Sequence, residues 1–541
     1  MWRGQDTFRR GWMCDWVGTS VTKVVTGVFG ASILWSMARP KQPQRTTTGV
    51  PGLDNLLQGG IPTGQMYLIE GDPGTGKTTL AMQFMIEGVE RGETSLYLTL
   101  SEPTTELKAS AASHGWSLDA VEIVEFVPDE ATLAPEEQYT VFHPSEVELA
   151  TTIQRLIAEV ERLKPDRLVI DSLSELRLLA SDAIRYRRQL LALKQYFAGR
   201  NTTVFLLDER TTDQSDMQLQ SIVHGVIRMQ KLPRSYGVTR RRIEVLKMRG
   251  SAFREGYHDY TLREGGVVVY PRLVAGEHES WFLGQDVTSG VPELDLILGG
   301  GIPRGSSTLV TGPTGIGKST ICMQFAIAAA MRGDRAIVYV FDEVLRTAKG
   351  RATSMGMEIE GPIERGMLSM TQVNPAELSP GEFIWQIRND VEERDARVVV
   401  IDSLNGLLYS MPGELDLILH LHELLAFLSQ KGVVTLLVMT QKGVVGSMSS
   451  DLNVSYLADT VLLMRYFEAA GEIRQTLSVL KKRLGSHERT LREFWFGKGG
   501  IKLGEPLTRF RGVLTGVPEL TGEAAGNGRG RRVLAGDDDL G

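Results

Sequence analysis

The sequence contains the same phosphate-binding motif twice, G-x-x-x-x-G-K-[ST], and this repeat constrains the fold more than any other feature. The first copy consists of Gly71, Asp72, Pro73, Gly74, Thr75, Gly76, Lys77 and Thr78, and the second of Gly312, Pro313, Thr314, Gly315, Ile316, Gly317, Lys318 and Ser319. The two lysines are 241 residues apart (318 − 77). A glycine-rich turn with an exposed lysine would explain one match, but two aligned matches predict two nucleotide sites.

Each residue type in the motif has a physical role. Glycines adopt backbone angles closed to other residues, so successive amide N–H groups can point at one phosphate. The helix that follows directs its positive N-terminal end at the same anion. We therefore expect Lys77 and Lys318 to reach the β- and γ-phosphates of ATP. We expect the hydroxyls of Thr78 and Ser319 to bind Mg²⁺.

The duplication extends well beyond these motifs. Residues 48–54 match 289–295, and 59–62 match 300–303, at the same offset of 241. Later, 168–173 match 399–404 at an offset of 231 (402 − 171), so the loops between the motifs differ in length. The chain therefore carries two copies of one domain.

Each half alternates short apolar runs with stretches of helical spacing. The apolar runs predict strands at 65–70, 94–100, 167–171 and 203–207, and at 307–311, 336–341, 397–402 and 433–439. Helices are expected at 80–89, 146–164, 321–330 and 415–430. Strands this apolar are typical of a parallel sheet covered by helices. Later runs at 242–247 and 475–480 predict a small antiparallel extension. The predicted fold class is α/β, with two tandem P-loop NTPase domains.

The expected domains are 46–276 and 277–510, with an N-terminal extension at 1–45 and a tail at 511–541. We expect the extension to be disordered or an incorrectly assigned start, with Met37 as the natural first residue. An ordered arm and a membrane contact are alternatives, because 24–37 is uncharged although short for a membrane span. The end of the tail, rich in Gly, Arg and Asp, is expected to be disordered.

Composition excludes several classes of protein. The net charge of −7 argues against a general polyanion binder, which usually carries a basic face. Two cysteines, Cys14 and Cys322, cannot form a disulfide framework or a four-cysteine zinc site. Cys322 follows the second motif and is expected in the core. We expect a cytoplasmic protein without nucleic-acid or membrane partners.

Acidic residues at strand ends complete the expected sites. Asp171 and Asp402 end apolar strands, where a carboxylate holds the shell of Mg²⁺; a turn aspartate is the alternative. Glu102 and Glu343 occupy equivalent places after another strand and are candidate bases. Asp342 precedes Glu343 and is a candidate too. Solvated loop acids are the alternative for these residues.

Basic residues follow the core in both halves. Lys247 and Arg249 in the first half correspond to Lys481 and Arg483 in the second. At a subunit interface such residues neutralise γ-phosphate charge on a neighbouring subunit, as arginine fingers do. A surface strand with alternating charges is equally consistent with the pattern.

Together these motifs resemble the KaiC family of RecA-like ATPases, over roughly residues 46–510. The resemblance implies two RecA-like domains that bind ATP with Mg²⁺ and hydrolyse it, in a homohexamer with ATP at subunit interfaces. It also implies autophosphorylation in the second half and signalling partner proteins that the sequence does not identify. It assigns catalytic roles to Glu102, Asp342 and Glu343, and roles on the neighbouring subunit to Lys247, Arg249, Lys481 and Arg483.

The sequence also departs from the family's pattern. The usual pair of glutamates is Ser101–Glu102 in the first half, which is expected to weaken or alter hydrolysis there, and Asp342–Glu343 in the second. The family's adjacent serine and threonine phosphosites fall on Ser455 and Tyr456. We expect phosphate on Ser455, against a plain loop serine.

Three functions fit the sequence. The first is a ring-forming regulatory ATPase that phosphorylates its own serine. The second is a RecA-class DNA-dependent ATPase or recombinase, against which the acidic composition argues. The third is an ATP-sensing scaffold with decayed hydrolysis.

Overall fold

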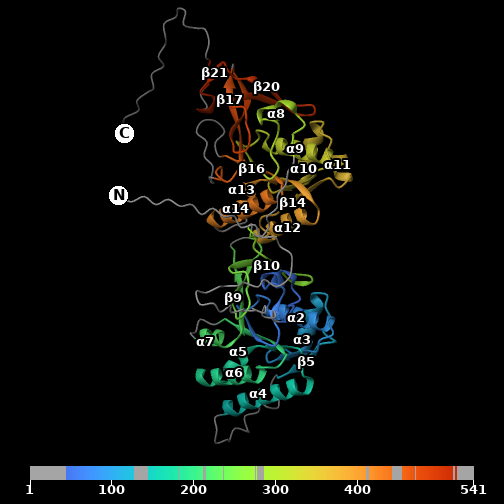
Figure 1. Ribbon diagram of the computed structural model, residues 1–541, viewed down its shortest axis with the longest axis vertical. Coiled ribbons are helices and arrows are strands. Elements are labelled where there is room, and N and C mark those ends of the chain that lie inside the picture. Colours follow the sequence, from blue (N-terminus) through green and yellow to red (C-terminus); the bar gives the residue numbers. More distant parts are fainter. Residues whose placement is uncertain are drawn as a thin grey trace, which may run out of the picture. The chain divides into compact units, whose positions relative to one another are not determined.

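The computed structural model describes residues 44–126, 144–180, 182–210, 215–234, 237–274, 276, 285–409, 414–441, 454–469, 471–515 and 518–520. The elements are drawn in Figure 1, blue to green for the first half and yellow to red for the second. Four parts of the chain lie wholly or mostly outside the described residues: the N-terminal extension, Cys14, the last 21 residues and residues 277–285, where the second expected domain begins. The expectations for those segments therefore stay predictions.

Among the described residues, the first half contains one sheet of nine strands in the order β11-β10-β9-β8-β3-β7-β6-β4-β5. Its strands are β3 (Met66–Gly71), β4 (Ser95–Thr99), β5 (Glu122–Glu125), β6 (Arg167–Asp171), β7 (Thr203–Glu209), β8 (Gly225–Leu232), β9 (Arg240–Met248), β10 (Tyr257–Arg263) and β11 (Gly266–Tyr270). The strands from β5 to β8 pair in parallel, and those from β8 to β11 pair antiparallel.

The described part of the second half repeats this arrangement in the order β14-β13-β15-β16-β12-β17-β18-β19-β20. Its strands are β12 (Ser307–Gly312), β13 (Arg335–Val340), β14 (Leu368–Gln372), β15 (Ala396–Asp402), β16 (Val434–Thr440), β17 (Thr460–Ala469), β18 (Glu472–Lys482), β19 (Arg492–Gly497) and β20 (Gly500–Pro506). Pairing is parallel from β14 to β17 and antiparallel from β17 to β20. Short ribbons join β1 (Arg45–Thr46) to β2 (Ile61–Pro62) and β21 (Phe510–Arg511) to β22 (Glu519–Leu520).

Helices are interleaved with the strands in both halves. The first half has α1 (Pro51–Leu56), α2 (Lys77–Glu90), α3 (Thr104–Ser113), α4 (Pro144–Leu163), α5 (Leu173–Leu179), α6 (Ala183–Phe197) and α7 (Ser215–Ile222). The second has α8 (Pro292–Ile297), α9 (Lys318–Met331), α10 (Leu345–Ser354), α11 (Glu360–Glu364), α12 (Pro380–Glu392), α13 (Leu404–Tyr409) and α14 (Glu414–Gln430). The α/β class with two mostly parallel sheets and antiparallel extensions is therefore confirmed. Two of the predicted helices, α2 and α9, begin at the motif lysines, three residues earlier than the apolar runs suggested. Several other helices, including α3, α6, α10 and α12, were not predicted.

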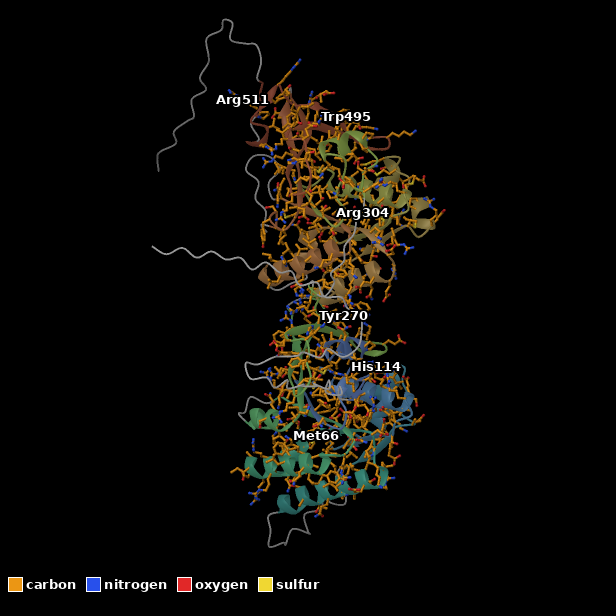
Figure 2. All side chains as sticks on the ribbon, viewed as in Figure 1. Met66, His114, Tyr270, Arg304, Trp495 and Arg511 are labelled. Carbon is orange, nitrogen blue, oxygen red and sulfur yellow. The ribbon has the colours of Figure 1, made fainter. Side chains whose placement is uncertain are left out.

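Both faces of each sheet are buried, as the apolar strands predicted. In β3, Tyr67 and Ile69 join a core with α2, whereas Met66 and Leu68 join a second core with α4, α5 and α6 on the opposite face. Met66, labelled in Figure 2, is 5% exposed. The alternation follows from the two-residue period of a strand. The helix after each phosphate motif therefore packs across the sheet, which fixes the position of the motif at the strand's end.

One buried charge distinguishes the two sheets. The side chain of Arg167 in β6 is 1% exposed and forms an ion pair with Glu93. Its guanidinium also donates to the carbonyl oxygens of Thr47 and Phe84, both at 2.8 Å. The position at the 231-residue offset in the second half is Val398, which is fully buried. The first half thus uses a buried arginine where the second uses a small apolar residue.

Replacing Arg167 with alanine should lower the free energy of unfolding of the first half by about 3 kcal/mol or more. The change removes the guanidinium donor from the carbonyl groups of Thr47 and Phe84 and creates a cavity. Lost hydrogen bonds of this kind and a cavity each cost on the order of 1–3 kcal/mol. Hydrogen exchange of β6 peptides under native conditions measures this effect separately from the second half. Arg91→Ala is the matched control, because its ion pair with Glu87 lies on the surface, with the arginine side chain 53% exposed. Equal protection in both variants would contradict the role assigned to Arg167.

Candidate functional site

The phosphate motifs lie between a buried strand and the helix that follows it. Gly76 and Gly317 directly precede α2 and α9 and have φ angles of 94° and 101°, in the left-handed region. A Cβ atom at Gly76 would lie 2.7 Å from the side chain of Leu262, and one at Gly317 would lie 2.2 Å from Phe496. The left-handed backbone angle therefore favours glycine directly before each motif lysine, and any larger residue would also have to displace the side chain of Leu262 or Phe496.

Both motif lysines are buried against their own loops. Lys77 is 9% exposed and donates to the carbonyl oxygens of Gly71 at 2.8 Å and Asp72 at 3.2 Å. Lys318 is 6% exposed and donates to Pro313 O at 2.8 Å. Burial lowers the pKa of both lysines, that of Lys318 to about 8. Each ammonium group is thus held against the carbonyl oxygens of its own loop. A bound anion there would raise the pKa of the lysine again.

This lowered pKa predicts a pH dependence of ATP binding at the second site. A triphosphate favours the charged form of Lys318, so affinity should be highest between about pH 6, where Asp402 titrates, and about pH 8, and should fall above this range as the lysine loses its proton. By linkage the fall approaches tenfold per pH unit, or about tenfold between pH 7 and pH 9. Titration of the Lys77→Ala protein with a non-hydrolysable ATP analogue measures it. Lys318→Arg, which stays charged, should give a nearly flat profile, and a flat profile for Lys318 itself would contradict the assignment.

The acid at the end of β6 lies against the motif threonine. Asp171 is 6% exposed, and its Oδ2 accepts hydrogen bonds from Thr78 Oγ1 at 3.1 Å and from the Tyr97 hydroxyl at 2.5 Å. Burial raises the pKa of Asp171, opposed by these two hydrogen bonds and by Lys77. No sequence motif marked Tyr97 as part of the site. In the second half the position at the 241-residue offset is Val338, so this support is specific to the first site.

The second site has the same acid and hydroxyl beside an open pocket. Asp402 accepts a hydrogen bond from Ser319, and burial together with Glu343 and Asp342 raises the pKa of Asp402 to about 6. A pocket of about 480 Å³ is lined by Lys318, Ser319 and Asp402, among others. This volume is within the range of small-molecule sites.

These hydroxyl and carboxylate oxygens fit the requirements of Mg²⁺. The ion prefers oxygen ligands and is usually held by one or two protein groups together with substrate phosphates. Thr78 with Asp171, and Ser319 with Asp402, supply such pairs. Among the described residues, no group of three or more His, Cys, Asp or Glu side chains could hold a metal ion alone. The donor sets therefore match a cation that arrives with a nucleotide.

The candidate bases have different surroundings in the two halves. Glu102 is partly buried, and burial with the nearby Asp171 and Glu106 raises its pKa. Within the described part of the chain, its carboxylate has no hydrogen-bond or ion-pair partner. Glu343, by contrast, forms a two-pronged ion pair with Arg351, at 2.6 and 2.8 Å.

Hydrogen bonds also hold the remaining acidic and polar side chains of the second site in place. Asp342 accepts a hydrogen bond from the Ser403 hydroxyl. Asn405 binds the backbone N–H of Thr440 through its Oδ1 at 2.8 Å and lines the pocket. Asn405 and Arg351 were missed by the sequence analysis, because an isolated amide or arginine in a helix carries no motif. The Asp402–Ser403 peptide bond is cis, like its counterpart in the first half.

The four expected interface residues lie on β9 and β18, or just beyond them. In the order of each sheet, β8 or β17 separates these strands from the strand that leads into the phosphate motif. Lys247 donates to Gln220 O at 2.6 Å, and Arg249 to Ser221 O at 2.8 Å. Within one chain these side chains thus bind the segment before β8, rather than their own motif.

The second half shows the same arrangement near the expected phosphosite. Lys481 donates to Ser455 O at 3.1 Å, and Arg483 donates to Tyr456 O at 2.6 Å and pairs with Asp459. Ser455 itself is exposed. The basic pair therefore lies next to Ser455 in the same chain.

A membrane contact is one of the alternatives for the N-terminal segment. None of the helices that the structure describes combines the length and apolar character needed to cross a bilayer. The residues of that segment lie outside the described part.

Sequence comparison places these features among known proteins. The family described as "ATPase: KaiC" matches residues 46–274 and again 287–508. The chain is 29% identical to "Circadian clock protein KaiC3" of Synechocystis sp., over 89% of this chain and 96% of that protein. It is 28% identical to "Circadian clock oscillator protein KaiC" of Parasynechococcus marenigrum, over 88% of this chain and 93% of that protein.

Proposed function

Because this chain belongs to the KaiC family of ATPases, we propose that it is a regulatory ATPase with one Mg-ATP site in each half and a serine autokinase activity in the second. The observation that carries the proposal is the duplicated site. Each half holds a buried lysine over a glycine loop, with a strand-end aspartate bonded to the motif hydroxyl. Two complete sets of these groups support two binding sites, in domains at 46–276 and 277–510.

Each site would work chiefly by positioning and charge. The amide groups of the loop and the start of α2 or α9 bind the phosphates, and Lys77 or Lys318 contacts the β- and γ-phosphates. Mg²⁺, held by the hydroxyl and aspartate oxygens, would neutralise charge on the departing phosphate. Glu102 or Glu343, the latter with Asp342 beside it, would orient the attacking group and accept its proton.

The basic residues on β9 and β18 support assembly into a ring. Lys247, Arg249, Lys481 and Arg483 do not contact the phosphate motif of their own chain in the described structure. We propose that they act on ATP bound by a neighbouring subunit in a homohexamer. Because they also hold the segments before β8 and β17, ATP at the interface would be linked to the position of those segments.

An autokinase reaction would place phosphate on Ser455. Its hydroxyl oxygen would attack the γ-phosphorus of ATP, its proton would pass to a carboxylate, and ADP would leave. The residue is exposed, and Lys481 and Arg483 bind the backbone beside it. A phosphate there adds nearly two negative charges next to two cations, which would change the contacts of this segment.

The relatives' names suggest a role in timing. We propose a cytoplasmic switch or timer that acts through partner proteins, without nucleic acid. The net charge of −7 supports the last point. Stimulation of ATP turnover by single-stranded DNA, with a steep salt dependence, would instead favour a recombinase.

Native mass measurement with and without Mg-ATP, followed by phosphopeptide mapping, tests the proposal. The expected result is a sixfold increase in mass with Mg-ATP and labelled phosphate on Ser455. Ser455→Ala should remove the label and Tyr456→Phe should keep it. A protein that hydrolyses ATP but stays unlabelled would refute the kinase activity. Assembly without turnover would favour a scaffold.

A further inference from the structure

The second site contains an ion pair that engages its candidate base. Arg351 in α10 donates through Nη1 and Nη2 to both carboxylate oxygens of Glu343, at 2.8 and 2.6 Å. Both side chains are partly buried, 29% and 23% exposed. Both residues also line the pocket beside Lys318. A two-pronged pair of this kind combines two charge-assisted hydrogen bonds in one fixed geometry.

The first site lacks this restraint. At the offset of 241 residues, Ser110 of α3 occupies the place of Arg351 (351 − 241 = 110), and Glu102 that of Glu343 (343 − 241 = 102). No described residue donates to the Glu102 carboxylate. Burial and the negative charges of Asp171 and Glu106 raise the pKa of Glu102, because they disfavour its ionised carboxylate. The two halves therefore hold equivalent glutamates in opposite environments.

This difference has a chemical consequence if both sites hydrolyse ATP. To accept the proton of an attacking water or hydroxyl, a carboxylate must present a free oxygen lone pair to it. Arg351 occupies one lone-pair site on each oxygen of Glu343 and fixes the orientation of the carboxylate. Glu343 must therefore break this pair before it can turn toward an attacking oxygen, whereas Glu102 has no such pair to break. In each turnover the attacking oxygen bonds to the γ-phosphorus, the bond to the β–γ bridging oxygen breaks, and the proton passes to the glutamate.

We propose that Arg351 is a positioning residue that restrains Glu343 and makes the second site the slower of the two, the reverse of the order expected from Ser101 alone. The inference rests on the proposed function, because it assigns Glu343 to proton transfer. The other charged groups close to the pair do not replace Arg351. Asp342 and Asp402 are acidic, and Lys318 is directed at the loop carbonyl of Pro313. Arg351 is thus the cation that determines the freedom of Glu343.

Steady-state kinetics of one site at a time tests the restraint. In the Lys77→Ala background, Arg351→Gln should raise kcat severalfold with KM within about twofold, and Arg351→Lys should keep the slow rate. In the Lys318→Ala background, the reciprocal change Ser110→Arg should lower kcat severalfold at unchanged KM. A lower kcat or a higher KM in Arg351→Gln would overturn the proposal, because it would show that Arg351 binds the phosphates.

A chemical measurement separates the restraint from the ATPase activity. Carbodiimide with glycine ethyl ester converts accessible carboxyl groups to amides, which peptide mass spectrometry quantifies. Arg351→Gln should increase the labelling of Glu343 severalfold, while Glu102 in the same digest stays unchanged as an internal reference. Equal labelling of Glu343 in both proteins would overturn the inference. Increased labelling in a protein without any turnover would confirm the restraint and refute the ATPase proposal instead.

Discussion

Replacing both Lys77 and Lys318 with alanine should abolish ATP turnover, lowering kcat/KM by about a hundredfold or more. Each change removes the only motif ammonium group at its site, where it would stabilise the charge that develops on the transferred phosphate. Losing one such preorganised contact typically costs about 10²–10³ in rate. ADP release at saturating Mg-ATP measures the effect.

The single variants show how the total ATP turnover is divided between the two sites. Lys318→Ala should keep the larger share of the turnover, because Glu102 is unrestrained, and Lys77→Ala the smaller share. Lys108→Ala and Lys502→Ala are matched controls on exposed surfaces of the two halves and should leave the rate unchanged. A double variant that keeps more than a tenth of the parent rate would show that the hydrolytic sites lie elsewhere.

The second large effect is expected at Glu102. In the Lys318→Ala background, Glu102→Gln should lower kcat by about a hundredfold, because the amide has nearly the same shape but cannot accept a proton. This is the lower end of the range for general acid–base catalysis. The parent rate should also fall at acidic pH as Glu102 becomes protonated. This fall in rate should begin at a pH above the ordinary pKa of a glutamate, because burial and nearby acids raise the pKa of Glu102.

Binding separates this effect from a structural defect. Glu102→Gln should bind a non-hydrolysable ATP analogue as tightly as its parent, since the glutamate contributes nothing to the loop that holds the phosphates. Glu106→Gln, which removes a nearby exposed acid, is the matched control and should keep most of the rate. A Glu102→Gln protein with normal turnover would assign the proton transfer in the first half to another group.

Much of the fold could be predicted from the sequence, because its strongest signals are local. The apolar runs at 167–171 and 203–207 coincide with β6 and with most of β7, because strands buried on both faces are apolar over most of their length. The edge strands β5 and β14 were not predicted. Their residues are mostly half-exposed, so their composition is mixed and no period stands out.

Only those residues of the candidate sites that belong to a sequence motif could be predicted. Lys77 and Asp171 belong to recurring patterns, whose position at strand ends follows from the order of elements. Tyr97 contacts Asp171, which is far from it in the sequence. Arg351 contacts the nearby Glu343 but belongs to no motif. A tyrosine in an apolar strand is indistinguishable in sequence from a core residue, and an arginine in an exposed helix from a solvated one. Their partners appear only once the sheet and helices are placed.

If each half binds its own nucleotide, one chain holds two separate sites for Mg-ATP. Isothermal titration with a non-hydrolysable ATP analogue in the presence of Mg²⁺ counts them directly. Two nucleotides should bind per chain, falling to one in Lys77→Ala and one in Lys318→Ala, and to none in the double variant. One nucleotide per parent chain, or no heat of binding at all, would contradict it.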